Sequence, residues 1–215
     1  MLAPAIETEI ADLAARYGRP HRVTAELGSW QFSPLTMGDR YGEVCMVVRR
    51  PSGKLITAKK TFYPPGAFRL LTGGVGHGER IAAALLREVA EETGLDIVVR
   101  RFLAVIEYQL REMGDGGRGI GDGLPILYPP SPTPSNFATF AFLLDETGGT
   151  LQAHDPGERI ESFRELAVAD LPVLAETLEH IPDTRDDEID GSWRDWGRFR
   201  AVAHHVIYAA LTSGE

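Results

Sequence analysis

Apolar positions recur along this chain with two periods, and each period predicts one kind of secondary structure. Apolar residues three or four positions apart are typical of an amphipathic helix that packs on a core. Short alternating or continuous apolar runs between turn signals are typical of strands. The helical period covers four segments, which are residues 5–17, 81–93, 169–178 and 193–211. The strand pattern covers residues 23–32, 43–50, 55–60, 68–71, 97–108 and 137–144.

The order of these segments predicts an α/β fold. Strands precede and follow the central helix at residues 81–93, and further helices lie toward both ends of the chain. Residues 51–54 are expected to be a hairpin turn, and Gly148-Gly149 a second turn. This order favours a mixed β-sheet between layers of helices. The expected divisions are an N-terminal helix and strand extension at 1–40, a main domain at 41–180, and a C-terminal helix at 181–215 packed on or beside it.

Composition and charge narrow the class of protein. At 215 residues and 43% hydrophobic, the chain is long enough to bury a sizeable core. The formal net charge of −9 argues against a duplex nucleic-acid binder, which normally presents a basic surface. No basic region followed by an apolar stretch opens the chain, and no run approaches membrane-spanning length. We therefore expect a soluble cytoplasmic protein without a membrane or duplex nucleic-acid partner.

A cluster of carboxylates follows a glycine-rich turn that begins at Gly73. On the predicted helix Glu88, Glu91 and Glu92 are three or four residues apart, so their side chains project from one side. Like charges at this spacing destabilise a bare helix, which indicates a neutralising cation. Carboxylate oxygens suit Mg²⁺ or Mn²⁺, and these ions usually work with the phosphates of a substrate. The alternative is a solvated acidic face, which is what most charge clusters on helices are.

The other side of this helix is apolar. We expect that side to dock on a core and so hold the acids in a defined place. The residues of the apolar side are Ala82, Ala83, Leu86, Val89 and Ala90.

The stretch GGVGHGERIAAALLREVAEETGL, from Gly73 to Leu95, resembles the complete Nudix box. Its fixed positions are Gly73, Glu79, Arg87, Glu88, Glu91, Glu92 and Gly94, and Val89 and Leu95 are its aliphatic positions. The flanks resemble the family's domain over roughly residues 41–172. The resemblance implies the Nudix-type α/β/α sandwich, with a mixed β-sheet, and metal-dependent hydrolysis of a nucleoside diphosphate linked to another group, X.

The resemblance also assigns roles to the residues of the box. It implies that Glu88 and Glu92 are the principal metal ligands, for Mg²⁺ or Mn²⁺. Glu91 either completes the metal shell through water or serves as general base. The backbone carbonyl near Gly73 is a further expected ligand. Arg87 is expected to orient Glu91, one turn further along the helix.

A further acidic residue from a later loop acts as metal ligand or base in many members of the family. Residues 156–163 resemble the acidic loop before the family's final strand. Glu161 is the first choice for this distal acid and Glu158 is the second. The alternative is that both are surface glutamates without a role. Glu165 stands where the family often has a tryptophan.

Three residues are candidates for binding the substrate: Arg69, Lys59 and Trp30. Arg69 ends the strand that enters the box and is expected to reach a phosphate. Lys59 and Lys60 share a strand whose alternation points one side chain inward and one outward. We take Lys59 as the candidate and Lys60 as a solvated residue. Trp30 is expected to stack on a base, with core packing on an edge strand as the alternative.

Two clusters on the C-terminal helix indicate structural roles. Adjacent side chains point about 100° apart on a helix, so His204 and His205 do not face one ion. Trp193, Trp196 and Phe199 recur at helical spacing and indicate packing. A contact between two copies of the chain, in a homodimer, stays open as the alternative.

The long glycine- and proline-rich stretch at residues 112–134 differs from its surroundings. Loops of this length are usually functional or without fixed structure. We interpret it as a flap over the substrate, because it joins two strands expected to flank the site. The alternative is a solvent-exposed insertion with no role.

The identity of X is ranked on weaker patterns. The segment before Tyr41 resembles, in its placement, the extra strands of ADP-ribose and nucleotide-sugar hydrolases. We therefore rank ADP-ribose or nucleotide sugars first and (deoxy)nucleoside triphosphates second. The proline and tyrosine that mark two groups of relatives are absent at residues 110–113.

Two other functions are compared with hydrolysis. Some Nudix modules sense nucleotide sugars without cleaving them, but those commonly lose box glutamates and carry a DNA-binding domain. This chain keeps every box glutamate, and its segment from Pro182 is short and acidic. An isomerase of isoprenoid diphosphates needs a catalytic cysteine, whereas Cys45 lies in the apolar run 44–48 and is expected to be buried.

Overall fold

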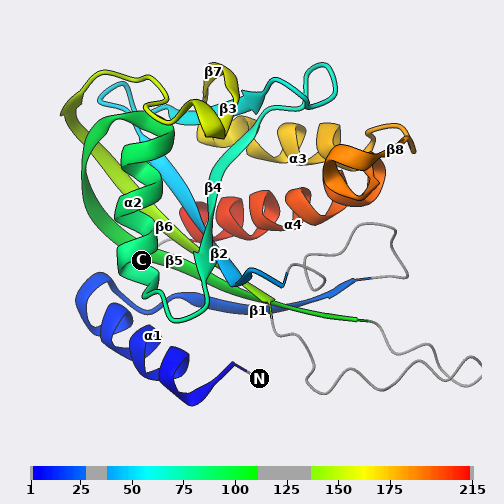
Figure 1. The fold of residues 1–215 in the computed structure, drawn as a ribbon. Helices are drawn as coiled ribbons and strands as arrows, with labels where there is room; N and C mark the ends of the chain where they lie inside the picture. Colours follow the sequence, from blue (N-terminus) through cyan, green and yellow to red (C-terminus); the bar gives the residue numbers. More distant parts are fainter. Residues whose placement is uncertain (1, 28–37, 111–136, 214–215) are drawn as a thin grey trace, which may run out of the picture.

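The computed structural model describes residues 2–27, 38–110 and 137–213 (Figure 1). Its helices are α1 (Pro4–Tyr17), α2 (Ile81–Thr93), α3 (Leu171–Glu179) and α4 (Trp193–Thr212). Its strands are β1 (His21–Leu27), β2 (Arg40–Arg49), β3 (Leu55–Lys60), β4 (Arg69–Gly76), β5 (Leu95–Leu110), β6 (Phe137–Gly149), β7 (Ile160–Leu166), β8 (Arg185–Asp186) and β9 (Gly191–Ser192). The four predicted helices are all present, within a few residues of their expected bounds.

One seven-stranded sheet organises the fold, with the strand order β1-β5-β6-β2-β4-β3-β7. The pairs β1–β5 and β2–β6 are parallel, and β4 is antiparallel to both of its neighbours. The predicted α/β class and mixed sheet are therefore confirmed. The N-terminal strand β1 is a full member of this sheet.

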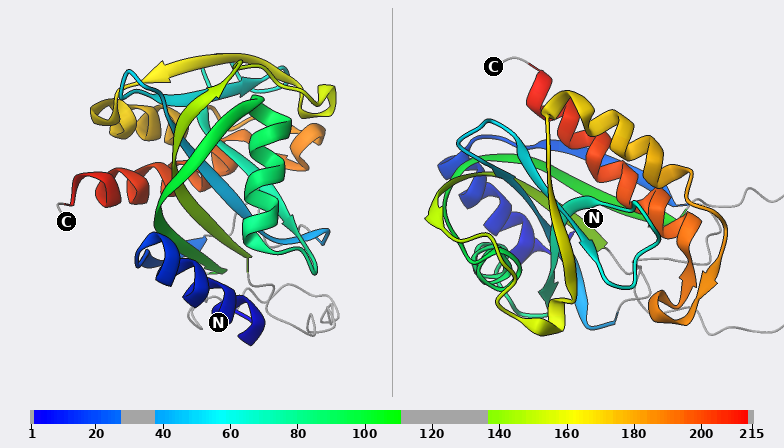
Figure 2. Two further views of the ribbon diagram at one scale, coloured as in Figure 1. Left: turned by 90° about the vertical axis from the view of Figure 1, so that its left-hand side faces the viewer. Right: turned by 90° about the horizontal axis from the view of Figure 1, so that it is seen from above.

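Helices cover both faces of the sheet, as the two views in Figure 2 show. Cys45 and Val47 point to the face covered by α3 and α4, and they join one apolar core. Val44 and Met46 alternate with them, point to the face of α1 and α2, and join the second core. This alternation explains why β2 is apolar at nearly every position, since a strand buried on both faces has no polar side.

Helix α2 faces its core with a different side from the one predicted. Ile81, Leu85 and Val89 are buried together with Glu88 and Glu92, whereas Leu86 is 57% exposed. The prediction that the apolar side opposite the glutamates docks on the core was therefore wrong. Positions 81, 85, 88 and 92 share one side of a helix, so Glu88 and Glu92 are carried inward by the same packing as the apolar residues.

Two strands extend beyond their predicted ends. Strand β4 continues through the glycines to Gly76, because it stays paired with β2. Strand β6 continues through Gly148 and Gly149, which pair with Asp96 and Leu95 at the start of β5. The expected turn at Gly148-Gly149 was wrong, since its backbone is part of the sheet. The chain turns instead after residue 149.

A fork between β3 and β4 sets the position of the functional site. Strand β3 pairs with β4 only at Thr57–Leu70 and Ala58–Arg69, and it runs on beside β7. Strand β4 runs on beside β2 as far as Gly76. Among the described strands, none pairs with the other edge of β4 beyond Leu70, so backbone and side chains there face a cavity. No helix in the described ranges is long and apolar enough to cross a membrane.

Candidate active site

A cavity of about 460 Å³ opens at this fork. Its wall includes Gly73 and Gly74 of β4, Glu88 of α2 and Lys60 at the end of β3. Glu158 closes it from the short 3-10 turn η2 (Pro156–Glu158), which precedes β7. With Arg40 of β2, the cavity therefore collects residues from five elements at the fork in the sheet.

Three carboxylates in this cavity lie within reach of one ion. Oxygens of Glu88, Glu91 and Glu158 all lie within 4.8 Å of one another. Glu88 is 5% exposed, and burial raises its pKa. An all-oxygen donor set of this kind suits Mg²⁺ or Mn²⁺, so the residues present fit a divalent ion.

Glu92 lies deeper than the other acids. It is 1% exposed, and its Oε1 has no hydrogen-bond partner among the described residues. Its nearest charge partner is the Lys60 Nζ at 3.6 Å. Burial raises the pKa of Glu92 to about 8, although the charges of Arg69 and Lys60 act in the opposite direction. Within the part of the chain that the structure describes, Glu92 Oε1 therefore has an ion pair with Lys60 but no hydrogen bond. A buried carboxylate in this state is stabilised by a further cation nearby, which is a second observation that fits a metal ion here.

Arg87 holds the acids in place. Its Nη1 donates to Glu88 Oε1 at 2.7 Å and to Glu91 Oε2 at 3.0 Å. Its Nε donates to Glu79 Oε1 at 2.9 Å, and its Nη2 donates to the carbonyl oxygen of Gly74 at 2.9 Å. All these contacts are within the chain, so Arg87 orients the cluster and ties α2 to β4.

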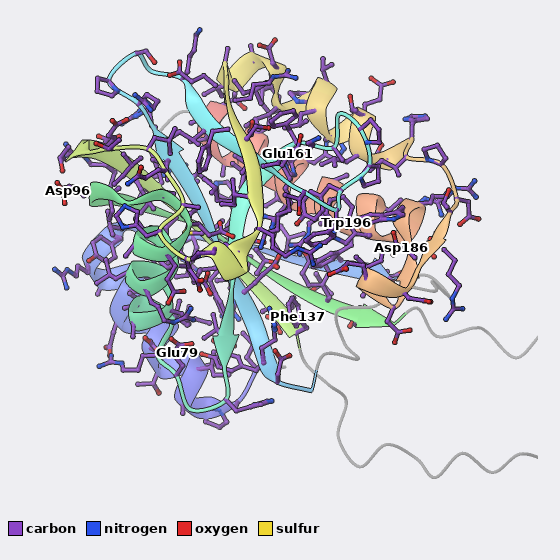
Figure 3. The ribbon with its side chains drawn as sticks, turned by 45° about the horizontal axis from the view of Figure 1, so that its top comes forward. Glu79, Asp96, Phe137, Glu161, Asp186 and Trp196 are labelled. Carbon is purple, nitrogen blue, oxygen red and sulfur yellow. The ribbon has the colours of Figure 1, made fainter. Side chains whose placement is uncertain are left out.

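The distal acid beside the cluster is Glu158, where the sequence favoured Glu161. Glu161 lies on β7, apart from Glu79 and the start of α2 (Figure 3), and its Oε1 pairs with Lys59 Nζ at 2.8 Å. Glu158 instead accepts from Lys60 Nζ at 2.7 Å. Burial is the largest single influence on Glu158 and opposes its ionisation, but the hydrogen bond and charge of Lys60, with smaller contributions from Glu92 and Arg69, together outweigh it and lower the pKa. The structure therefore places Glu158, the second choice, beside the cluster, and it places Glu161, the first choice, outside the cavity.

The loop geometry before β7 explains why Glu158, and not Glu161, lies at the cavity. Asp155 accepts from the backbone N–H of Gly157 and so closes the turn that carries Glu158. The backbone N–H groups of His154 and Asp155 both donate to the carbonyl oxygen of Glu91, which fastens the loop to the end of α2. Arg159 has a left-handed backbone (φ 54°), which reverses the chain before β7 begins. These features place Glu158 at the cavity and Glu161 outside it.

Of the two lysines on β3, it is Lys60 and not Lys59 that lies at the cavity. Lys59, the candidate for substrate binding, pairs with Glu161 away from the cavity. Lys60, expected to be solvated, has an 18% exposed side chain that lies between Glu92 and Glu158. The alternation of a strand predicts that one of the two points inward, but the phase depends on the register with β7, which shifts between Lys59 and Lys60.

Arg69 does not reach the cavity as predicted. It is 4% exposed, and its Nε donates to Tyr63 Oη at 2.9 Å. Its Nη1 donates to the carbonyl oxygen of Leu70 and to Thr72 Oγ1. These hydrogen bonds therefore hold the Arg69 guanidinium beneath the site. Trp30, the candidate for base stacking, lies outside the described residues, as does the 112–134 loop.

The histidines and aromatic residues of α4 are structural. His204 is 2% exposed; its Nε2 accepts from the backbone N–H of Leu70, and its Nδ1 lies 2.8 Å from the carbonyl oxygen of Arg200. Trp193, Trp196 and Phe199 are each at most 4% exposed within this single chain. They pack inside the α3/α4 core, which agrees with the packing role and leaves these side chains little surface for a contact with a second copy.

Sequence analysis missed a cationic residue of the cavity, Arg40. It begins β2, and its guanidinium lies over Gly74, where an added Cβ would come within 2.8 Å of Nη1. Its position just outside the apolar run of β2 was the only available signal. Lys60 and Glu158 were considered, but their places were not recognised.

A family model for the NUDIX domain matches residues 40–187. The match covers more than half of the chain, and two glutamates of the box, Glu79 and Glu88, line the cavity. The chain belongs to the Nudix family. This is a family of hydrolases that act on phosphorus-containing acid anhydrides. No curated protein is similar enough in sequence to count as a match.

Several solved structures are similar to this chain at low identity. A UDP-X diphosphatase is 14% identical with a TM-score of 0.46, and the match covers 82% of this chain but only 64% of that one. An ADP-ribose pyrophosphatase from Streptococcus suis is 14% identical with a TM-score of 0.43, over 81% of this chain and 93% of the other. The dihydroneopterin triphosphate pyrophosphohydrolase of E. coli is 18% identical with a TM-score of 0.39, over 64% and 86%. Likenesses at this level do not identify the substrate.

Proposed function

We propose that this chain is a divalent-metal-dependent hydrolase that cleaves the pyrophosphate of a nucleoside diphosphate linked to X. The observation that carries the proposal is the grouping of Glu88, Glu91 and Glu158 within 4.8 Å, beside an oxygen of Glu92 that has no hydrogen bond among the described residues. Such a set holds Mg²⁺ or Mn²⁺ through oxygen ligands. When bound, the ion supplies positive charge against the pyrophosphate oxygens and makes water a stronger nucleophile at neutral pH.

The chain's own residues divide the remaining work. Arg87 fixes the carboxylates of Glu88 and Glu91, which reduces the reorganisation needed when an ion binds. Lys60 keeps Glu158 ionised and therefore able to act as a ligand. Positioning and charge stabilisation of this kind account for most of the catalysis of phosphoryl transfer.

Glu91 is the residue we propose as general base. Its side chain is 35% exposed, whereas that of Glu88 is 7% exposed and that of Glu158 is 22% exposed. It is thus the acid of the cluster with the best access to an attacking water. Its hydrogen bond with Arg87 holds it in place without burying it. The role as a ligand through water stays the alternative.

For the substrate we propose ADP-ribose or a nucleotide sugar. The supporting observation is β1, which adds residues that precede the box to the edge of the sheet, parallel to β5. This matches the placement on which the resemblance to ADP-ribose and nucleotide-sugar hydrolases rests. Nucleoside and deoxynucleoside triphosphates are the second candidates, since the acid cluster serves either substrate equally.

A substrate panel tests the proposal. Phosphate release, coupled to a phosphatase, is measured with Mg²⁺ or Mn²⁺ over ADP-ribose, nucleotide sugars, dinucleoside polyphosphates, and canonical and oxidised triphosphates. The expected result is turnover of a diphosphate-linked nucleotide that stands well above the rest and is lost in Glu158→Gln. Binding of a nucleotide sugar to the metal-loaded chain without turnover would support the sensing module instead.

A further inference from the structure

Three cationic side chains line the cavity, and two of them are occupied by its acids. Lys60 pairs with Glu158 and Glu92. Arg87 pairs with Glu88 and other box glutamates. Neither cation is available to a substrate without giving up a contact that orders the cluster. Arg40 is the third cation of the wall.

Arg40 is held differently. Its Nε and Nη2 donate to the carboxylate of Asp39, the preceding residue, at distances between 2.6 and 3.1 Å. Asp39 is the side-chain hydrogen-bond partner of Arg40 within the described residues. The Asp39 side chain is 64% exposed and that of Arg40 is 37% exposed. An ion pair this open to solvent contributes little net stability, so exchanging Asp39 for another anion costs little.

The position of Arg40 directs it toward the cavity. Gly74 carries no side chain, and the guanidinium occupies the space that a Cβ would need. The hydrogen bonds to Asp39 raise the pKa of Arg40 despite its partial burial, and the charges of Glu43 and Glu88 raise it further. Arg40 therefore stays charged, and it lies close enough to Glu88 to interact electrostatically with its carboxylate.

The chemistry of a bound diphosphate matches this arrangement. One part of the anion lies against the ion held by the carboxylates, and the remaining phosphate oxygens need donors. A guanidinium donates two parallel hydrogen bonds to a phosphate group, in the geometry that Arg40 now gives to Asp39.

We propose that Arg40 binds a phosphate group of the substrate and that Asp39 occupies the guanidinium until the phosphate displaces it. Arg40 is then a substrate-positioning residue, and Asp39 is an internal competitor. The inference rests on the proposed function, because it takes a nucleoside diphosphate as the ligand. It makes opposite predictions for two neighbouring residues, which a merely structural role of the pair does not.

The test measures binding of the non-hydrolysable α,β-methylene-ADP, with Mg²⁺, by titration calorimetry. Arg40→Gln should weaken binding roughly tenfold or more, as expected for loss of charge-assisted hydrogen bonds. Asp39→Asn should tighten binding by a few fold, since the guanidinium no longer has to be freed. Arg100→Gln is the matched control, because Arg100 of β5 forms an ion pair with Asp145 of β6 and neither residue lines the cavity. It should leave the affinity unchanged.

Each result of these measurements either supports or overturns the assignment of Arg40. Unchanged affinity in Arg40→Gln, or weaker binding in Asp39→Asn, overturns the assignment of Arg40 while leaving the hydrolase intact. A wild-type chain that neither binds the analogue nor turns over the panel overturns the proposed function with it. Thermal unfolding checks that Arg40→Gln folds, and if it does not, unchanged affinity in Asp39→Asn alone is enough to reject the inference. In turnover assays, the Arg40→Gln effect should fall on KM more than on kcat.

Discussion

The Glu88 carboxylate lies where the side chain of residue 73 would be if that residue were not glycine. A Cβ built on Gly73 would stand 1.9 Å from Glu88 Cδ. Gly73 belongs to β4 and Glu88 to α2, so this contact joins sheet and helix at the acid cluster. The glycine therefore provides the space in which a carboxylate is buried and aimed at the cavity.

The first prediction concerns this contact. Gly73→Ala should displace the Glu88 carboxylate and lower the free energy of unfolding by about 1–3 kcal/mol, because added volume forces packed neighbours to move. Mn²⁺ affinity, measured by titration, should fall by at least about tenfold, the lower limit for disturbing groups that orient metal ligands. Gly38→Ala is the control, since among the described residues no atom beyond its chain neighbours lies within 4 Å of its added Cβ. Wild-type Mn²⁺ affinity in Gly73→Ala would show that Glu88 is not a ligand.

The second prediction separates the two candidates for the distal acid. Glu158→Gln should reduce turnover by at least about tenfold, because it removes a charged oxygen within 4.8 Å of Glu88 and Glu91. Glu161→Gln should change the rate by less than about twofold, since it breaks only an exposed ion pair with Lys59. Steady-state rates of both variants at saturating Mg²⁺ give the comparison. A larger effect from Glu161→Gln would return the role to that residue.

Glu158 and Glu161 also show which features of the site cannot be predicted from the sequence. Periodicity predicts helices and strands well because burial of one side of an element imposes a repeat on its sequence. The helix Ile81–Thr93 and the mixed sheet follow from that relation. The orientation of Glu158 follows instead from an Asp155 cap and a left-handed Arg159, which are backbone features with no repeat.

The errors in the cavity have a common physical origin. Glu88 and Glu92 were expected on the side of α2 away from the core, because the opposite side is apolar. They are buried because Gly73 leaves room for Glu88 and because Arg69 and Lys60 lie near Glu92. Such compensation involves residues far apart in sequence, so no local pattern announces it. The sequence therefore predicts the chemical type of the site, whereas the residues that lie near each buried glutamate depend on the fold.

The third prediction concerns Glu92. Glu92→Gln should remove a buried carboxylate that would hold the ion and that has an oxygen without a hydrogen bond among the described residues. It should reduce turnover by about 100-fold or more, beyond the effect of disturbing a group that only orients ligands. The fold should persist, because glutamine has nearly the same shape and avoids the cost of burying a charge. Far-UV circular dichroism and turnover with Mg²⁺ are measured together. Glu176→Gln, at an exposed position of α3, is the control. Full activity in Glu92→Gln would remove Glu92 from the proposed metal site.

His204 provides a prediction about pH that is independent of catalysis. Burial lowers the pKa of His204 from 6.5 to about 4, although its hydrogen bond to the carbonyl oxygen of Arg200 acts in the other direction. The folded chain therefore keeps His204 neutral where the unfolded chain binds a proton. Stability from this residue is complete above the unfolded pKa of 6.5 and is lost as the pH falls toward 4.

Between about pH 7.5 and pH 5, this one histidine should cost the wild-type chain about 2 kcal/mol of unfolding free energy, from the linkage between pKa and stability. His204→Gln keeps an acceptor for the Leu70 N–H but does not titrate, so its stability should fall less over the same interval. Urea unfolding at both pH values measures the difference. Carboxylates that titrate below pH 5 affect both proteins alike and cancel. His205→Gln, at the exposed neighbouring position, should lose stability as the wild type does. Equal losses in wild type and His204→Gln would mean that His204 is protonated in the folded chain, and its bond from Leu70 would then have to break in acid.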